Sequence, residues 1–182
     1  MSTGTSATPV RRKAPGRSLT GLLWSLLPVL AVLVLVVWWQ RGEARPVATV
    51  DPGPDVAYAQ RAAPVRLPGP GPLPDGWRAT SSRVDAPSGE GRSPVTLDIG
   101  YLTAGERFAR LVVSDAPVAS VLRERVPESS RDGTAAVGAA SWDRYRTARG
   151  EVALVTRVGP ATVLVTGDAP PDDLARLAAS VR

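Results

Sequence analysis

An uncharged apolar run from Ser18 to Gln40, SLTGLLWSLLPVLAVLVLVVWWQ, is the feature that most constrains this chain. Taken as a helix from Leu19 to Trp39, the run is about 31 Å long at 1.5 Å per residue. A typical bilayer has a hydrocarbon core about 30 Å thick, and a helix pairs all of its backbone polar groups within that core. The run therefore predicts a single transmembrane helix over residues 18–40.

The residue types within this run are those of a simple anchor. An internal proline predicts a modest kink, and a Trp-Trp pair ends the run where an aromatic belt meets the membrane surface. The run contains no ionisable residue and no GxxxG motif, so it shows no sign of an ion pathway or of strong helix pairing. We interpret it as a membrane anchor with the key residues Leu19, Trp24, Pro28, Trp38 and Trp39.

Basic residues lie mainly on the N-terminal side of the run. We interpret residues 1–17 as a disordered cytoplasmic tail whose topology determinants are Arg11, Arg12, Lys13 and Arg17. Because an excess of Lys and Arg marks the cytoplasmic side of a span, we expect a single-pass protein of the cytoplasmic membrane with an extracytoplasmic C-terminal part. Two alternatives stay open, a cleaved signal peptide and the reversed topology. The apolar region of a signal peptide has only about 7–15 residues.

Charge and composition exclude several classes of function. The formal net charge is +5, and four of these charges lie in the tail, so the rest of the chain offers no basic surface to a nucleic acid. Cys and His are absent, which excludes disulfides, zinc sites of the thiolate or histidine type, and Ser-His-Asp or Cys-His catalysis. Nucleotide-binding glycine motifs are missing as well. We expect no cofactor and no metal.

Residues 41–72 differ from both of their neighbours in composition. They contain seven prolines among Ala, Gly and Arg, and they show no apolar periodicity. Such sequences form stiff, extended spacers. We therefore predict a linker over 41–72, in which the stretch 56–63 (VAYAQRAA) allows one short helix.

Residues 73–182 predict one extracytoplasmic α+β domain. In the stretch VTLDIGYL, apolar residues alternate with small or polar ones, as in a strand with one buried face. The terminal stretch PDDLARLAAS opens with proline and two acids and then repeats apolar residues at helical spacing. We predict an antiparallel sheet of about five to seven strands, with a short inserted helix after Asp115 and the C-terminal helix packed on one face. The strands that the pattern indicates lie near 77–84, 95–102, 108–114, 141–146, 152–158 and 161–166.

Four features occur in a fixed order along the chain. They are the membrane run with its proline-rich segment, Leu73-Pro-x-Gly-Trp77, Leu97-Asp-Ile-Gly-Tyr-Leu-Thr103, and Trp142-x-x-Tyr145 followed by Val165-Thr-Gly167 and Leu174-Ala-x-Leu177. In these features the chain resembles an actinobacterial family of single-pass membrane proteins catalogued as domain of unknown function 4245. The resemblance implies a membrane-associated, outward-facing domain, and it supplies no activity, ligand or catalytic residue.

The stretch WDRYR is the first candidate for a binding site. On a strand, Trp142, Arg144 and Arg146 share one face. A tryptophan beside two arginines is able to stack on and hold an anionic sugar or a lipid headgroup. The alternative is that Trp142 belongs to the core and that the arginines extend into solvent.

The function that we expect is a non-enzymatic binding or interaction module of the cell envelope. Its partners would be the lipid bilayer and an envelope component or another membrane protein. One alternative is a hydrolase of wall glycans that uses paired carboxylates. The candidate carboxylates for that reaction are Asp98, Glu106, Asp143 and Glu151. A second alternative is a structural accessory subunit of a membrane complex.

Overall fold

The computed structural model describes residues 28–33, 35, 48–87 and 93–182. The chain divides into two compact units, residues 1–46 and 47–182, which are described separately. In the first unit, residues 28–33 and 35 are helical, and their apolar side chains are exposed. No helix among the described residues is long and apolar enough to cross a membrane. Pro28 lies at the start of the described helical residues, and the rest of the predicted tail and span lies outside the described part. The predicted span over 18–40 therefore stays a prediction.

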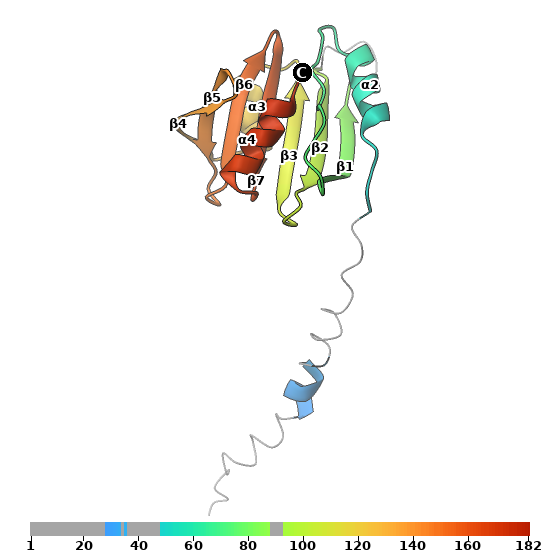
Figure 1. The fold of residues 1–182 in the computed structure, drawn as a ribbon, viewed down its shortest axis with the longest axis vertical. Helices are drawn as coiled ribbons and strands as arrows, with labels where there is room; N and C mark the ends of the chain where they lie inside the picture. Colours follow the sequence, from blue (N-terminus) through green and yellow to red (C-terminus); the bar gives the residue numbers. More distant parts are fainter. Residues whose placement is uncertain (1–27, 34, 36–47, 88–92) are drawn as a thin grey trace, which may run out of the picture. The chain divides into compact units, whose positions relative to one another are not determined.

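The second unit is built on one antiparallel sheet of seven strands in the order β1-β2-β3-β7-β6-β5-β4 (Figure 1). This confirms the predicted α+β fold with its antiparallel sheet and C-terminal helix. The sequence indicated six strands and missed β4, which lies at the sheet edge, where exposed residues show no alternation. The strands are β1 (Arg78–Asp85), β2 (Thr96–Leu102), β3 (Phe108–Ser114), β4 (Ser130–Val137), β5 (Ala140–Arg146), β6 (Val152–Val158) and β7 (Ala161–Gly167).

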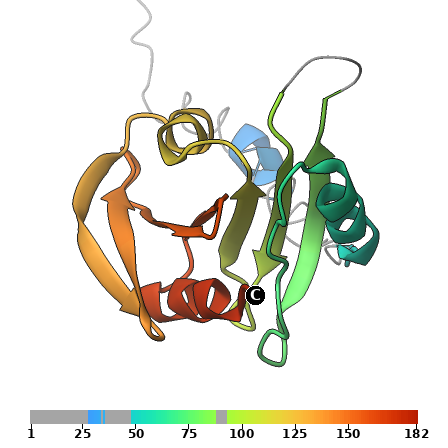
Figure 2. The same ribbon diagram turned by 90° about the horizontal axis from the view of Figure 1, so that it is seen from above.

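Two helices cover opposite faces of the sheet (Figure 2). Helix α4 (Pro171–Ser180) packs its buried leucines into the main core with β2, β3 and β7. Helix α3 (Val118–Arg125) instead packs on the other face, where Val121 joins a second cluster with Val112 and Leu164. The prediction that both helices share one face is wrong. The central strands carry apolar side chains on both faces, so both faces need a cover.

A further helix, α2 (Gly53–Ala62), lies beside β1 (Figure 1). Its residues Val56 and Ala59 pack into the main core. The chain then returns through residues 63–72, which we call the return segment, and this segment places Leu67 at 0% exposure. Residues 48–72 are thus part of the folded unit, in contrast to the predicted linker over 41–72. The sequence did not indicate this, because the many alanine and proline residues of the segment give no clear apolar periodicity.

Backbone hydrogen bonds attach the return segment to the end of the chain. Gly69 N–H donates to the Arg182 carbonyl at 2.9 Å, and Arg182 N–H donates back to the Gly69 carbonyl at 3.1 Å. Gly71 N–H donates to the Ser180 carbonyl at 2.9 Å. These paired bonds resemble a short antiparallel ladder, and they hold the return segment next to α4.

Substitution of Leu67 tests whether the return segment is part of the fold. Leu67→Ala removes a fully buried side chain and should lower the free energy of unfolding by about 2–5 kcal/mol. The measurement is urea unfolding of the full chain in detergent micelles. Arg66→Ala is the matched control, because its exposed side chain should change stability by no more than about 0.5 kcal/mol. Equal stability of the two variants would mean that the segment is an unpacked linker.

Candidate functional site

Trp142, the centre of the predicted ligand site, lies in the main core. Its side chain is 3% exposed and belongs to the same cluster as Leu174 and Leu177 of α4. A ring so enclosed has no free face for stacking on a ligand. Trp142 is therefore a core residue, and it does not form a surface site with its neighbours in the sequence.

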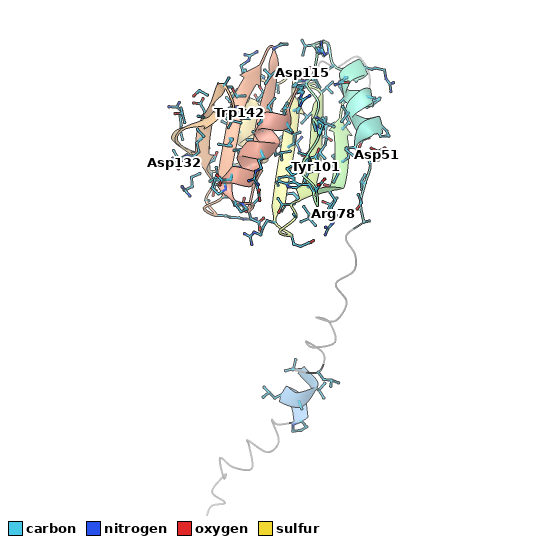
Figure 3. The ribbon with its side chains drawn as sticks, in the orientation of Figure 1. Asp51, Arg78, Tyr101, Asp115, Asp132 and Trp142 are labelled. Atoms are coloured by element: carbon cyan, nitrogen blue, oxygen red, sulfur yellow. The ribbon has the colours of Figure 1, made fainter. Side chains whose placement is uncertain are left out.

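The two arginines of the predicted ligand site both interact with one carboxylate. Asp132 of the neighbouring strand β4 accepts Arg146 at 3.1 Å, and its carboxylate lies 3.4 Å from Arg144 Nε. Arg144 also donates to the Asp132 backbone carbonyl at 3.0 Å. Figure 3 shows Asp132 and Trp142 at the β4–β5 side of the sheet. Both arginines are engaged in the folded chain, and their predicted role in holding a ligand stays a prediction.

Three of the four candidate catalytic carboxylates are in ion pairs. Asp98 accepts Arg110 Nε at 2.7 Å and lies 3.2 Å from Arg125 of α3. Its hydrogen bond to Arg110 raises the pKa of that guanidinium. Glu106 pairs with Arg78 at 2.7 Å, and Asp143 pairs with Arg131. These three carboxylates are thus already engaged by arginine, which leaves Glu151 as the one candidate without an ion pair among the described residues.

A different site appears between α2, β1 and the return segment. Here the surface forms a groove of about 570 Å³. This volume lies within the range of about 300–1,000 Å³ that is usual for ligand sites. Val50, Val56, Leu73, Trp77 and Tyr101 supply its apolar and aromatic lining. We call this hollow the α2–β1 groove.

Two aromatic side chains meet within the groove. The ring centroids of Trp77 and Tyr101 are 6.5 Å apart, with the planes tilted by 57°. Such pairs add to the stability that burial provides. Trp77 is partly buried, whereas Tyr101 is only 3% exposed. Burial alone raises the pKa of Tyr101 to about 12, and its hydroxyl has no hydrogen-bond partner among the described residues.

Polar side chains are placed around these rings with part of their hydrogen-bonding capacity unused. Asp51 accepts a hydrogen bond from the Gly53 N–H at 2.9 Å through Oδ1, and this bond does not use its other carboxylate oxygen. Gln60 donates to the Leu67 carbonyl at 3.1 Å through Nε2, and its side-chain carbonyl remains as an acceptor. Figure 3 shows Asp51, Arg78 and Tyr101 on the same side of the sheet. Apolar walls with a few polar groups are typical of binding sites.

No local sequence pattern indicated this groove. Its residues come from the segment predicted as a linker, from residues 73–77, and from β1 and β2, and only the fold brings them together. The one available signal was Trp77, a large aromatic residue placed directly after the Leu-Pro-Asp-Gly turn. The short helix allowed over 56–63 is present as α2 (Gly53–Ala62), but the sequence did not indicate that it packs beside β1.

A second, more polar hollow of about 430 Å³ lies at the C-terminal end of α3. Glu128, Arg149 and Glu151 are among the residues that line it. The described residues contain no group of three His, Cys, Asp or Glu side chains arranged to hold a metal ion. Two carboxylates, Glu128 and Glu151, are thus among the residues that line this hollow.

The buried phenol predicts how stability depends on pH. The pKa of Tyr101 is about 12 in the folded chain and 10.0 in the unfolded chain, so the unfolded chain loses its proton first. The stability contributed by the neutral phenol is complete below pH 10 and is lost as the pH rises toward 12. Tyr101→Phe should therefore reduce the fall in the free energy of unfolding over that range, as measured by urea unfolding at each pH.

The matched control for this test is Tyr58→Phe, on the outer side of α2, where the side chain is 50% exposed. In this variant the free energy of unfolding should fall at alkaline pH by as much as it does in the wild type. If the free energy of unfolding of Tyr101→Phe also fell by as much as that of the wild type, the phenol of Tyr101 would be solvated in the folded chain.

Comparison with known proteins places the chain in a family. No curated protein and no solved structure matches it. A family model described as "Protein of unknown function (DUF4245)" matches residues 16–181, which include the whole of the sheet and its helices. The chain therefore belongs to the DUF4245 family.

Proposed function

We propose that this chain is a membrane-anchored, extracytoplasmic binding module and that the α2–β1 groove is its binding site. The groove carries the proposal, because it combines aromatic walls with polar groups that have unused hydrogen-bonding capacity. The uncharged run over 18–40 supports the anchor. The Lys/Arg excess before that run supports an outward-facing domain.

Because α2 belongs to the folded unit, the tether between the proposed anchor and the domain is short. If the span ends at Gln40, only residues 41–46 separate it from the second unit. Six residues reach at most about 22 Å when fully extended. The domain would thus be held close to the membrane surface rather than displayed on a long stalk. A binding partner would have to be present in that narrow layer.

A wall-glycan hydrolase remains the second candidate. It is favoured by one observation, that Glu128 and Glu151 line the same hollow. Paired carboxylates of glycosidases stand about 5–10 Å apart. Cleavage of wall glycan that disappears in Glu151→Gln would establish this function in place of binding.

The topology can be tested with single cysteines, because the chain has none of its own. Ala139→Cys places a thiol in the exposed turn between β4 and β5, and Ser6→Cys places one in the basic tail. A membrane-impermeant maleimide should label the first thiol in right-side-out vesicles and the second thiol in inverted vesicles. Each variant is the control for the other.

The reverse labelling pattern would contradict the proposed orientation. Recovery of the domain in the soluble fraction, without residues 1–40, would show that the run is a cleaved signal peptide. The first result would remove the extracytoplasmic placement, and the second would remove the membrane anchor.

A further inference from the structure

We propose that the α2–β1 groove binds a neutral saccharide chain, with a sugar ring against Trp77 and sugar hydroxyls bonded to Tyr101, Asp51 and Gln60. This inference rests on the proposed function, since it names the ligand of the same groove. It follows from four observations: the aromatic pair, the unused polar groups, the charge of the lining, and the edge of β1.

The aromatic pair suits the apolar face of a sugar ring. Trp77 lines the groove and is partly buried, and its ring makes a tilted contact with that of Tyr101, with the ring centroids 6.5 Å apart. A pyranose ring has one face made mostly of C–H groups, and these pack well on an aromatic surface. The hydroxyl groups at the rim of the ring then point toward the groove walls.

The polar groups of the groove require a ligand that both donates and accepts hydrogen bonds. Tyr101 offers a phenolic O–H, whereas Gln60 and Asp51 offer oxygen acceptors. Sugar hydroxyls meet both needs. An acyl chain meets neither, and a polar group that such a ligand covers without pairing it costs about 1–3 kcal/mol. A polyproline helix lacks backbone donors, so it leaves the acceptors unpaired.

The charge of the lining favours a neutral ligand. Asp51 and Arg78 are the charged residues of the groove, and their charges are opposite. Arg78 is already paired with Glu106 at 2.7 Å, which reduces its attraction for a phosphate or another anion. Nothing in the described lining gives the groove a net positive field.

The edge of β1 is closed to a peptide strand at the groove. Val50 N–H donates to the Ala79 carbonyl at 2.9 Å and so occupies the position where an added strand would begin pairing. Recognition of a peptide by strand addition depends on such free edge groups. A ligand held by side chains, as a saccharide is, does not need them.

The test uses the full chain in phosphatidylcholine nanodiscs, which avoids detergents with sugar headgroups. Chitotetraose and maltotetraose are the probes, and saturation-transfer NMR and calorimetry measure their binding. We expect saturable binding of at least one probe. Tyr101→Phe should weaken it by about tenfold, the effect of losing one hydrogen bond. The thermal midpoint at pH 7 should stay that of the wild type, because the hydroxyl has no partner among the described residues of the folded chain.

Tyr145→Phe is the matched control, because that tyrosine packs against the cluster on the opposite face of the sheet. It should bind like the wild type. Trp77→Phe keeps an aromatic ring in the groove with a smaller surface, so it should weaken binding without unfolding the chain. Wild-type affinity in both groove variants, or no binding of either probe, would overturn the inference.

Two further probes separate this inference from the function on which it rests. A proline-rich peptide and nanodiscs of phosphatidylglycerol are tested on the same variants. Binding of either, weakened by Tyr101→Phe in the absence of saccharide binding, would overturn the saccharide and keep the groove as the binding site. Saccharide binding by a chain whose cysteine labelling is reversed would keep the inference and remove the extracytoplasmic function.

Discussion

The pairing between the return segment and the C-terminal residues organises this unit. Gly69 and Arg182 exchange two backbone hydrogen bonds, and Gly71 adds a third to Ser180. A Cβ atom at Gly71 would lie 2.5 Å from the Ser180 carbonyl oxygen, so this approach requires glycine. The return segment and the last residues of the folded unit are thereby joined. Leu67, at 0% exposure, fills the space beneath them.

This pairing has two consequences for function. It holds the return segment in place, and this segment lines the groove together with α2, β1, Trp77 and Tyr101. It also removes residues 48–72 from the spacer, which would bring the proposed site near the membrane. A binding site and its tether are therefore determined by the same contacts. Loss of the pairing would be expected to weaken the fold and the groove together.

Local patterns predicted the parts of the fold whose burial is one-sided. The alternation of Leu97, Ile99 and Tyr101 indicated β2, and the leucine spacing in 171–180 indicated α4. The position of α3 was not predictable in this way, because β3 and β7 are apolar on both faces. Helix α2 and the groove depend on contacts between distant segments. Alanine and proline carry little local signal for such contacts.

Hydrogen exchange at Gly69 and Gly71 tests most directly whether the return segment belongs to the fold. Both N–H groups are bonded to carbonyls at the C-terminus and so should be part of the cooperative unit. Their exchange in the full chain should then be as slow as that of the central strand β3, since it requires opening of the whole unit. Exchange at the rate of an unstructured peptide, with β3 still protected, would show that residues 63–72 are a free linker. The groove and the short tether would then not exist.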